Sequence, residues 1–149
     1  MKYLILTLTS LIIFNSCIDK SNINPEPIND VPVNLTINLA LPTYFHMQNI
    51  NTYVLENGGV KGIVIVHNAD DKFYAFDRVC SFQPSNSCAK IEIDSFVYQF
   101  RCGKTTNSGF IKCCDSKFSF DGIVAQGPAQ YGLKQYLITR NGNFLIVSN

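Results

Sequence analysis

The sequence predicts an all-β domain, an antiparallel sandwich or small barrel of about nine short strands. Three observations predict this fold class. Short runs rich in Val, Ile, Phe and Tyr recur along the chain, and turn-forming Asn, Gly and Asp residues separate them. No stretch of about 12 residues has the apolar periodicity of a helix. Many short strands with regular turn signals are typical of β-sandwiches and small barrels.

The expected strands follow in order along the chain. Residues 33–39 (VNLTINL) alternate apolar and polar side chains, as a strand with one buried face does. Turn signals stand at 57–59, 68–70, 107–109 and 141–143. In RNGNFLIV, Asn141 and Gly142 suit a type I′ turn between the last two strands. The other expected strands are residues 62–66, 72–77, 90–93, 96–100, 109–112, 122–126, 134–140 and 143–148.

The N-terminus, MKYLILTLTSLIIFNSC, has the layout of a secretory signal. Its apolar run, 3–14, is shorter than the roughly 20 residues of a membrane span. Small residues leading into Cys17 resemble the signal of bacterial lipoproteins, which implies cleavage after residue 16 and a lipid on the Cys17 sulfur. The alternative is an ordinary signal peptide with a coincidental Cys, which keeps the export and loses the anchor.

The expected domain boundaries follow from this signal. Residues 1–16 form the signal peptide, and residues 17–32 form a lipidated Cys followed by a flexible tether rich in Asn and Pro. Residues 33–149 form the folded domain. The lipid places the protein in the cell envelope, on the inner or the outer membrane.

The charge balance excludes polyanionic partners. Residues 1–16 contain one of the 12 Lys and Arg residues and none of the 11 Asp and Glu residues, so the mature chain has 11 of each. A neutral chain without runs of like charge predicts no binding to nucleic acid. Export also favours disulfides among the cysteines that follow Cys17.

Three stretches, FYAFDRVCSFQP (73–84), CCDSKFSFDG (113–122) and GPAQYGLKQYLI (127–138), resemble the Rieske iron–sulfur domain. The resemblance covers roughly residues 60–149 and implies an antiparallel β fold in which two loops hold a [2Fe–2S] cluster. Ser116, Phe118, Gly122 and the GPA stretch at 127–129 follow the family's second loop and the segment after it without a gap.

The ligand positions of that family are not retained. Cys80 matches the first ligand Cys, but Phe82 stands at the first ligand His, and a phenyl ring has no lone pair for iron. The second pair falls on Ile111 and Cys114 or, in an alternative register, on Cys113 and Ser116. We therefore expect no metal and no cofactor; the alternative is a [2Fe–2S] cluster with unusual ligation. The two histidines lie outside both loops, with His46 expected in an exposed loop and His67 at a polar strand end.

The resemblance also implies how the cysteines pair. In high-potential members of the family a disulfide joins the two loops, and the corresponding positions here are Cys88 and Cys113. Cys80 and Cys114 would then face each other across the vacated cluster site and form a second disulfide. Cys102 is left over, as a buried thiol or as the site of an intermolecular bond.

Three functions remain open at this point. The first is a binding or structural module without a cluster, with an envelope protein partner at the Phe82 tip; in that case Phe82 either plugs the vacated site or points outward as a contact. The second is electron transfer through an unusually ligated cluster. The third is thiol–disulfide chemistry of Cys80 and Cys114 beside Lys112 or Lys117. The sequence contains no recognisable catalytic set of Ser, His and Asp or of paired carboxylates, so it does not favour an enzyme.

Overall fold

The computed structural model describes residues 26–149. The expected signal peptide and Cys17 lie outside the described residues. Within this part of the chain, no helix is long and apolar enough to cross a membrane. The described elements are β1 (Asn34–Asn38), a 3₁₀ helix η1 (Phe45–Gln48), β2 (Thr52–Glu56), β3 (Ile63–His67), β4 (Phe73–Asp77), β5 (Ile91–Asp94), β6 (Gln99–Thr106), β7 (Gly109–Ser119), β8 (Val124–Gln126), β9 (Gln135–Asn141) and β10 (Phe144–Ser148).

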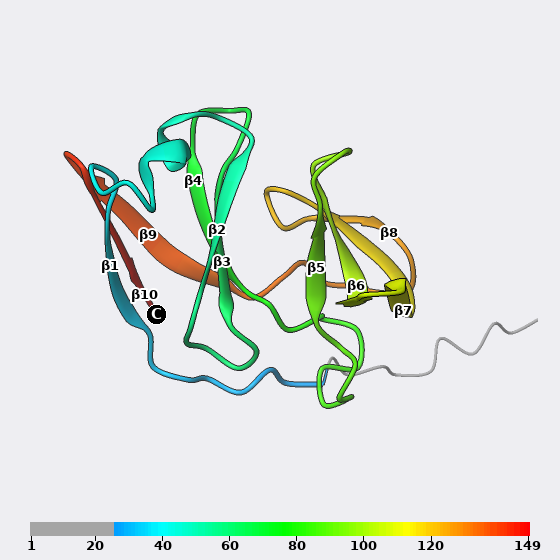
Figure 1. Ribbon diagram of the computed structural model, residues 1–149. Coiled ribbons are helices and arrows are strands. Elements are labelled where there is room, and N and C mark those ends of the chain that lie inside the picture. Colours follow the sequence, from blue (N-terminus) through cyan, green and yellow to red (C-terminus); the bar gives the residue numbers. More distant parts are fainter. Residues whose placement is uncertain (1–25) are drawn as a thin grey trace, which may run out of the picture.

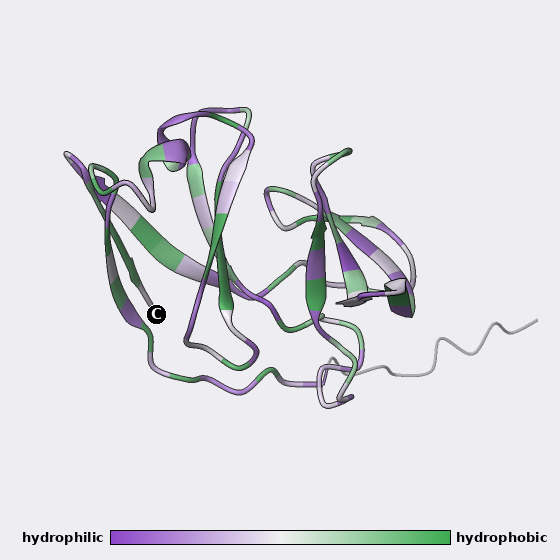
Figure 2. Ribbon diagram, viewed as in Figure 1, coloured by the Kyte–Doolittle hydropathy of each residue, from purple (hydrophilic) through white to green (hydrophobic). Residues whose placement is uncertain are grey.

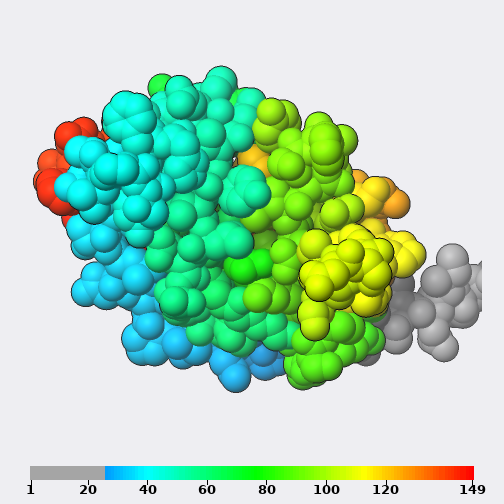
Figure 3. Space-filling model, viewed as in Figure 1, coloured from blue at the N-terminus to red at the C-terminus, as the bar shows by residue number. Residues whose placement is uncertain are grey.

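The strands form two antiparallel sheets, which confirms the all-β prediction. One sheet has six strands in the order β1-β10-β9-β4-β3-β2, and the other has four in the order β5-β6-β7-β8. Figure 1 shows the six-stranded sheet on the left and the four-stranded sheet on the right. In the space-filling view of this face, the two sheets form one continuous body (Figure 3).

Most expected strands are present, with differences in bounds and turns; β6 and β7 in particular extend beyond the expected strands, to residues 106 and 119. Residues 52–56 (TYVLE) form β2, which was not expected from the sequence and which pairs with β3 at every residue. Residues 95–98 form a turn in which the Phe96 amide donates to Asp94 Oδ1 (3.3 Å), so only residues 99 and 100 of the strand expected at 96–100 are in β6. The last hairpin has Gly142 and Asn143 as its two-residue loop, and only Gly142 has positive φ, so the type I′ turn is wrong and a type II′ pattern takes its place.

Strand β3 separates two hydrophobic cores because its alternate side chains point to opposite faces and all five residues are buried. We call them the aliphatic core and the cysteine core. Figure 2 shows the apolar residues concentrated on the strands and many polar residues in the connecting loops. The aliphatic core comprises Val33, Ile37, Leu39, Met47, Ile63, Ile65, Ala75, Tyr136, Leu145 and Val147. The cysteine core comprises Val64, Val66, Phe76, Cys80, Ala89, Ile91, Phe100, Cys102, Phe118, Phe120, Ala129 and Leu133.

A buried carboxylate joins the end of β4 to the turn before β3. Asp77 is completely buried and accepts four hydrogen bonds, which compensates the cost of its burial. Gly59 has φ +59°, and a Cβ there would collide with the Asp77 carboxylate, so this close approach requires glycine. The donors are the amides of Val60 (2.6 Å), Lys61 (3.2 Å) and Val79 (2.9 Å) and the hydroxyl of Tyr136 (2.8 Å).

Residues 29–33, most of which fall in the expected tether, lie against the domain. The Lys134 ammonium donates to the Asn29 carbonyl (2.8 Å) and to Asp30 Oδ1 (2.9 Å). The Asn149 side chain donates to the same Asp30 oxygen (3.0 Å) and accepts from the Val33 amide (2.7 Å). These contacts fix the chain on the domain before β1 begins.

Candidate thiol site

The 78–90 loop, between β4 and β5, carries Cys80 and is held from inside by Lys61. The Cys80 amide donates to the Ala89 carbonyl (3.1 Å), which closes the loop at its base. The Lys61 ammonium has three N–H donors, and each finds a carbonyl of this loop. Its acceptors are the carbonyls of Pro84 (3.2 Å), Asn86 (2.7 Å) and Ala89 (2.8 Å).

The second half of the site is a wide bulge between β6 and β7. Arg101 pairs with Lys117 and Gly103 pairs with Lys112, so one residue of β6, Cys102, faces the four residues 113–116 of β7. A bulge of this kind bends the strand and changes the direction of its side chains. It lies within the 11-residue strand β7.

The segment after β8 supports this bulge. The Ala129 amide donates to Ser116 Oγ (3.1 Å), and Ser116 is buried. Gly127, with φ +96°, lies so close to the backbone of Asp115 and Ser116 that a Cβ would collide with it. The SKF and GPA stretches that carried the sequence resemblance therefore contact each other.

A disulfide joins the 78–90 loop to the bulge. It links Cys88 to Cys113, with Cα atoms 5.6 Å apart and a sequence separation of 25. This pairing was predicted from the sequence resemblance. A covalent link between two loops reduces the conformational freedom of the unfolded chain more than that of the folded one.

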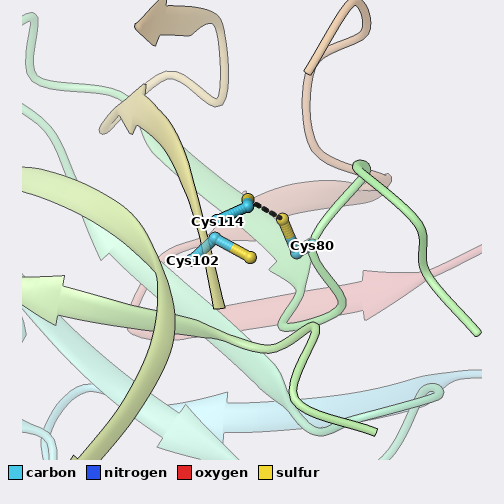
Figure 4. Close-up of side chains that lie close together, drawn as sticks. All are labelled: Cys80, Cys102 and Cys114. Atoms are coloured by element: carbon cyan, nitrogen blue, oxygen red, sulfur yellow. Dashed lines mark hydrogen bonds between the residues drawn. The ribbon is translucent and has the colours of Figure 1, made fainter. Parts of the chain in front are cut away.

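Beside the disulfide, three free thiols lie close together: Cys80, Cys102 and Cys114, which we call the cysteine trio. The predicted second disulfide, Cys80–Cys114, is therefore not formed in the structure, although its two sulfur atoms are neighbours. The sulfur atoms of the trio all lie within 4.8 Å of one another. Figure 4 shows the three side chains converging, with a dashed line between the sulfurs of Cys80 and Cys114, which are 3.9 Å apart. Cys80 and Cys102 are completely buried and Cys114 is half-buried.

Hydrogen bonding shifts the pKa values of two of the thiols in opposite directions. A hydrogen bond from Cys102 is the main cause that lowers the pKa of Cys80 to about 7, with a further contribution from the Lys61 charge. The same bond, together with burial, raises the pKa of Cys102, because loss of its proton would break the bond. Cys80 is therefore the thiol that ionises first within this pair.

The structure places the other residues of the predicted site as follows. Phe82 is half-buried and packs against the cysteine core. Ile111 is 58% exposed on β7 and is neither in the cysteine core nor among the side chains packed against it. His46 is exposed, as expected. His67 is 2% exposed: its Nδ1–H donates to the Met47 carbonyl (2.9 Å), and Nε2 lies 2.8 Å from Asp71.

Two residues of the site, Cys102 and Lys61, were not assigned to it from the sequence. Cys102 was expected to be either a buried thiol or the site of an intermolecular bond, and the structure shows it buried. Its burial rules out an intermolecular bond in this fold. Its position beside Cys80 and Cys114 was not expected. Phe100 and Cys102 stand two residues apart on β6, both buried, and this spacing would have placed Cys102 in the core if the strand had been extended past residue 100. The cation beside Cys80 and Cys102 is Lys61, while Lys112 forms a surface ion pair with Asp115 (2.6 Å).

The two antiparallel sheets, with a disulfide between the 78–90 loop and the β7 bulge, form a Rieske-like β fold. No protein-family model and no curated protein matches this chain. Among solved structures, it is similar in fold to the cyanobacterial plasma membrane Rieske protein PetC3 from Synechocystis PCC 6803. The TM-score is 0.54, at 19% identity, over 76% of this chain and 99% of that chain. The ferredoxin of carbazole 1,9a-dioxygenase from Nocardioides aromaticivorans IC177 aligns with a TM-score of 0.47, at 14% identity, over 79% and 97% of the two chains.

The donor atoms at this place do not fit a Rieske cluster. Such a cluster takes two Cys on one iron and two His on the other. Among the described residues the group consists of three thiols and contains no imidazole, since the rings of His46 and His67 are hydrogen-bonded elsewhere. What the trio can do is form a disulfide or bind a soft metal ion.

Proposed function

We propose that this chain is a cell-envelope lipoprotein whose Rieske-like domain works without a [2Fe–2S] cluster, as a binding or structural module. The observation that carries the proposal is the cysteine trio, which takes up the space between the two loops with three thiols and no imidazole. The Cys88–Cys113 disulfide holds the 78–90 loop and the β7 bulge together in this module.

The iron content of the purified protein tests this proposal. Protein made with ample iron and sulfide should be colourless, and metal analysis should find no stoichiometric iron. A visible charge-transfer spectrum with about two irons per chain would show electron transfer through an unusually ligated cluster instead.

The anchor requires a separate test, because it depends only on the first 17 residues. Full-length protein should partition into the detergent phase, and mass spectrometry should find a lipid on Cys17. The variant Cys17→Ala should remain unprocessed. A soluble product with a cleaved, unmodified N-terminus would contradict the anchor and leave the domain proposal intact.

A second candidate function is thiol–disulfide exchange, favoured by the 3.9 Å between the sulfurs of Cys80 and Cys114. Oxidation of this pair gives one S–S bond and releases two electrons and two protons, which reduce a disulfide of a partner protein to two thiols. The half-buried Cys114 is the sulfur that a partner can reach.

Peptide mapping after equilibration in glutathione buffers measures this reaction. A Cys80–Cys114 bond that is open in reducing glutathione buffers and closed in oxidising ones supports exchange. A bond that stays closed throughout indicates a structural disulfide. A bond that never forms excludes both thiol–disulfide exchange and a structural disulfide at this pair.

For the binding module, we propose that an envelope protein partner contacts the tip of the 78–90 loop, beside Phe82.

A further inference from the structure

We propose that the reduced cysteine trio is a binding site for one thiophilic metal ion, of which Cu(I) fits best. The site consists of Cys80 from the 78–90 loop, Cys102 from β6 and Cys114 from the β7 bulge. This inference rests on the proposal that no [2Fe–2S] cluster occupies the same place, since the sulfur atoms cannot serve both.

The spacing of the sulfur atoms agrees with a single metal ion. At a metal–sulfur distance of about 2.3 Å, two sulfurs of one ion lie about 3.8 Å apart in tetrahedral geometry and about 4.0 Å apart in trigonal geometry. The sulfurs of Cys80 and Cys114 are 3.9 Å apart, and all three lie within 4.8 Å of one another. A movement of well under 1 Å per side chain brings the third sulfur to the same distance.

The chemistry of the donors selects the kind of ion. The group contains sulfur only, and no His, Asp or Glu of the described chain belongs to it. Thiolate sets favour Cu(I), Zn²⁺ and iron–sulfur clusters over hard cations such as Mg²⁺ and Ca²⁺. Zn²⁺ almost always takes four ligands in structural sites. Three sulfurs without a fourth protein donor therefore favour Cu(I), which is stable with three.

The surroundings supply charge and access. Metal binding deprotonates the thiols, so the site gains negative charge when it fills. Lys61 is the neighbouring cation: it interacts with Cys80 and Cys102 and is fixed by its three carbonyl acceptors. Cys80 and Cys102 are completely buried, which keeps water away from the ion, while Cys114 is half-buried and gives the ion a route in.

Metal binding and the Cys80–Cys114 disulfide exclude each other, because the disulfide removes two of the three ligands. The metal-bound form therefore requires the trio to be reduced. It also protects the thiols from oxidation, which gives a readout independent of metal analysis.

An anaerobic Cu(I) titration of the full-length chain tests the site. The background variant is Cys17→Ser, so that no thiol outside the domain contributes. Cu(I) is supplied from a chelator of known affinity, and binding is followed by near-ultraviolet sulfur-to-copper charge transfer. The expected result is one Cu(I) per chain. Cys102→Ser and Cys114→Ser should each weaken binding by about 100-fold or more, since each removes a ligand. Cys114 is half-buried, so Cys114→Ser tests the site even where Cys102→Ser prevents folding.

Thiol counting completes the experiment. After exposure to air, metal removal and unfolding, Cu(I)-loaded protein should have three thiols that react with iodoacetamide, whereas metal-free protein should have one. A titration without stoichiometric Cu(I), or binding that Cys114→Ser leaves unchanged, would overturn the metal site and leave the cluster-less domain standing. Stoichiometric iron and sulfide in the purified protein would overturn both. Stoichiometric binding of Zn²⁺ with none of Cu(I) would overturn the choice of ion.

Discussion

The two cores on opposite faces of β3 differ in composition and in chemistry. The aliphatic core is made almost entirely of aliphatic side chains and contains one buried polar pair, Tyr136 and Asp77, in which each group satisfies the other. The cysteine core combines aromatic rings with three free thiols, and the Phe100 ring stacks on Phe120 at 5.0 Å.

Strand β3 therefore separates a core of aliphatic side chains from a core that contains reactive thiols. Ile63 and Ile65 of β3 point into the aliphatic core, and Val64 and Val66 point into the cysteine core. Side chains in the cysteine core can therefore change without disturbing the packing between β1, β9 and β10. Phe82 and the trio all lie on the cysteine-core side of this strand.

The largest expected effect comes from removing an aromatic ring of the cysteine core. Phe100→Ala should lower the free energy of unfolding by about 3–5 kcal/mol, because the buried ring leaves a cavity beside Cys102. Leu145→Ala, in the aliphatic core, should cost about 2–5 kcal/mol. Urea unfolding measures both.

Native alkylation of Cys102 distinguishes the two variants. Phe100→Ala should expose the thiol faster than Leu145→Ala does at matched stability, because only the first opens the space around the trio. Equal alkylation rates at matched stability would contradict the independence of the two cores.

Next in size is the disulfide. The double variant Cys88→Ser and Cys113→Ser should lower the free energy of unfolding by about 3 kcal/mol, the entropic effect expected for a loop of this length. Hydrogen exchange should quicken in the 78–90 loop and at residues 112–117. It should stay slow in β3, β9 and β10, and acceleration throughout those strands would show that the disulfide stabilises both cores together.

Some strands of this fold could be predicted from the sequence and others could not. Alternation in 33–39 and the Asn-Gly-Asn turn were enough for β1, β9 and β10, because these strands have one exposed face. Strand β2 was missed because TYVLE is partly exposed along its length and is defined only by its pairing with β3, 7 residues or more away. The turn at 95–98 depends on Asp94 accepting the Phe96 amide, which competes with a run of aromatic residues that favours a strand.

Only part of the site was predicted, because the rest of it also depends on contacts that have no local sequence signal. Cys88 and Cys113 follow the register of a family and were paired by that resemblance. The trio requires one residue of β6 to face four of β7, and a bulge of this size has no local sequence signal. Lys61 lies 19 residues before Cys80 and reaches the 78–90 loop only through the turn that Asp77 fixes.

A smaller effect is expected at the tip of the 78–90 loop. Phe82 is only half-buried, so Phe82→Ala should lower the free energy of unfolding by about 1–2 kcal/mol, below the range for a fully buried ring. The destabilisation should be confined to the cysteine core, and the alkylation of Cys114 should become faster. Gln83→Ala, at the exposed neighbouring position, is the control and should leave both unchanged. If Phe82→Ala unfolds at the same urea concentration as the parent, the ring contributes nothing inside and the tip is the first surface to test for a protein partner.

The smallest effect at neutral pH lies in the aliphatic core, and it changes with pH. Tyr136→Phe should lower the free energy of unfolding by about 1 kcal/mol, because the hydroxyl donates to Asp77 (2.8 Å). Burial, aided by the Asp77 bond, raises the pKa of Tyr136 well above its usual value near 10. The unfolded chain therefore loses this proton first, and the stability that the protonated hydroxyl provides, complete below pH 10, declines as the pH rises further. Tyr136→Phe should show a shallower alkaline decline than the parent, whereas Tyr131→Phe, at a half-exposed position, should match the parent. Urea midpoints from pH 7 to pH 11 measure this, and an unchanged alkaline slope in Tyr136→Phe would show that the buried pair does not control the alkaline stability of the aliphatic core.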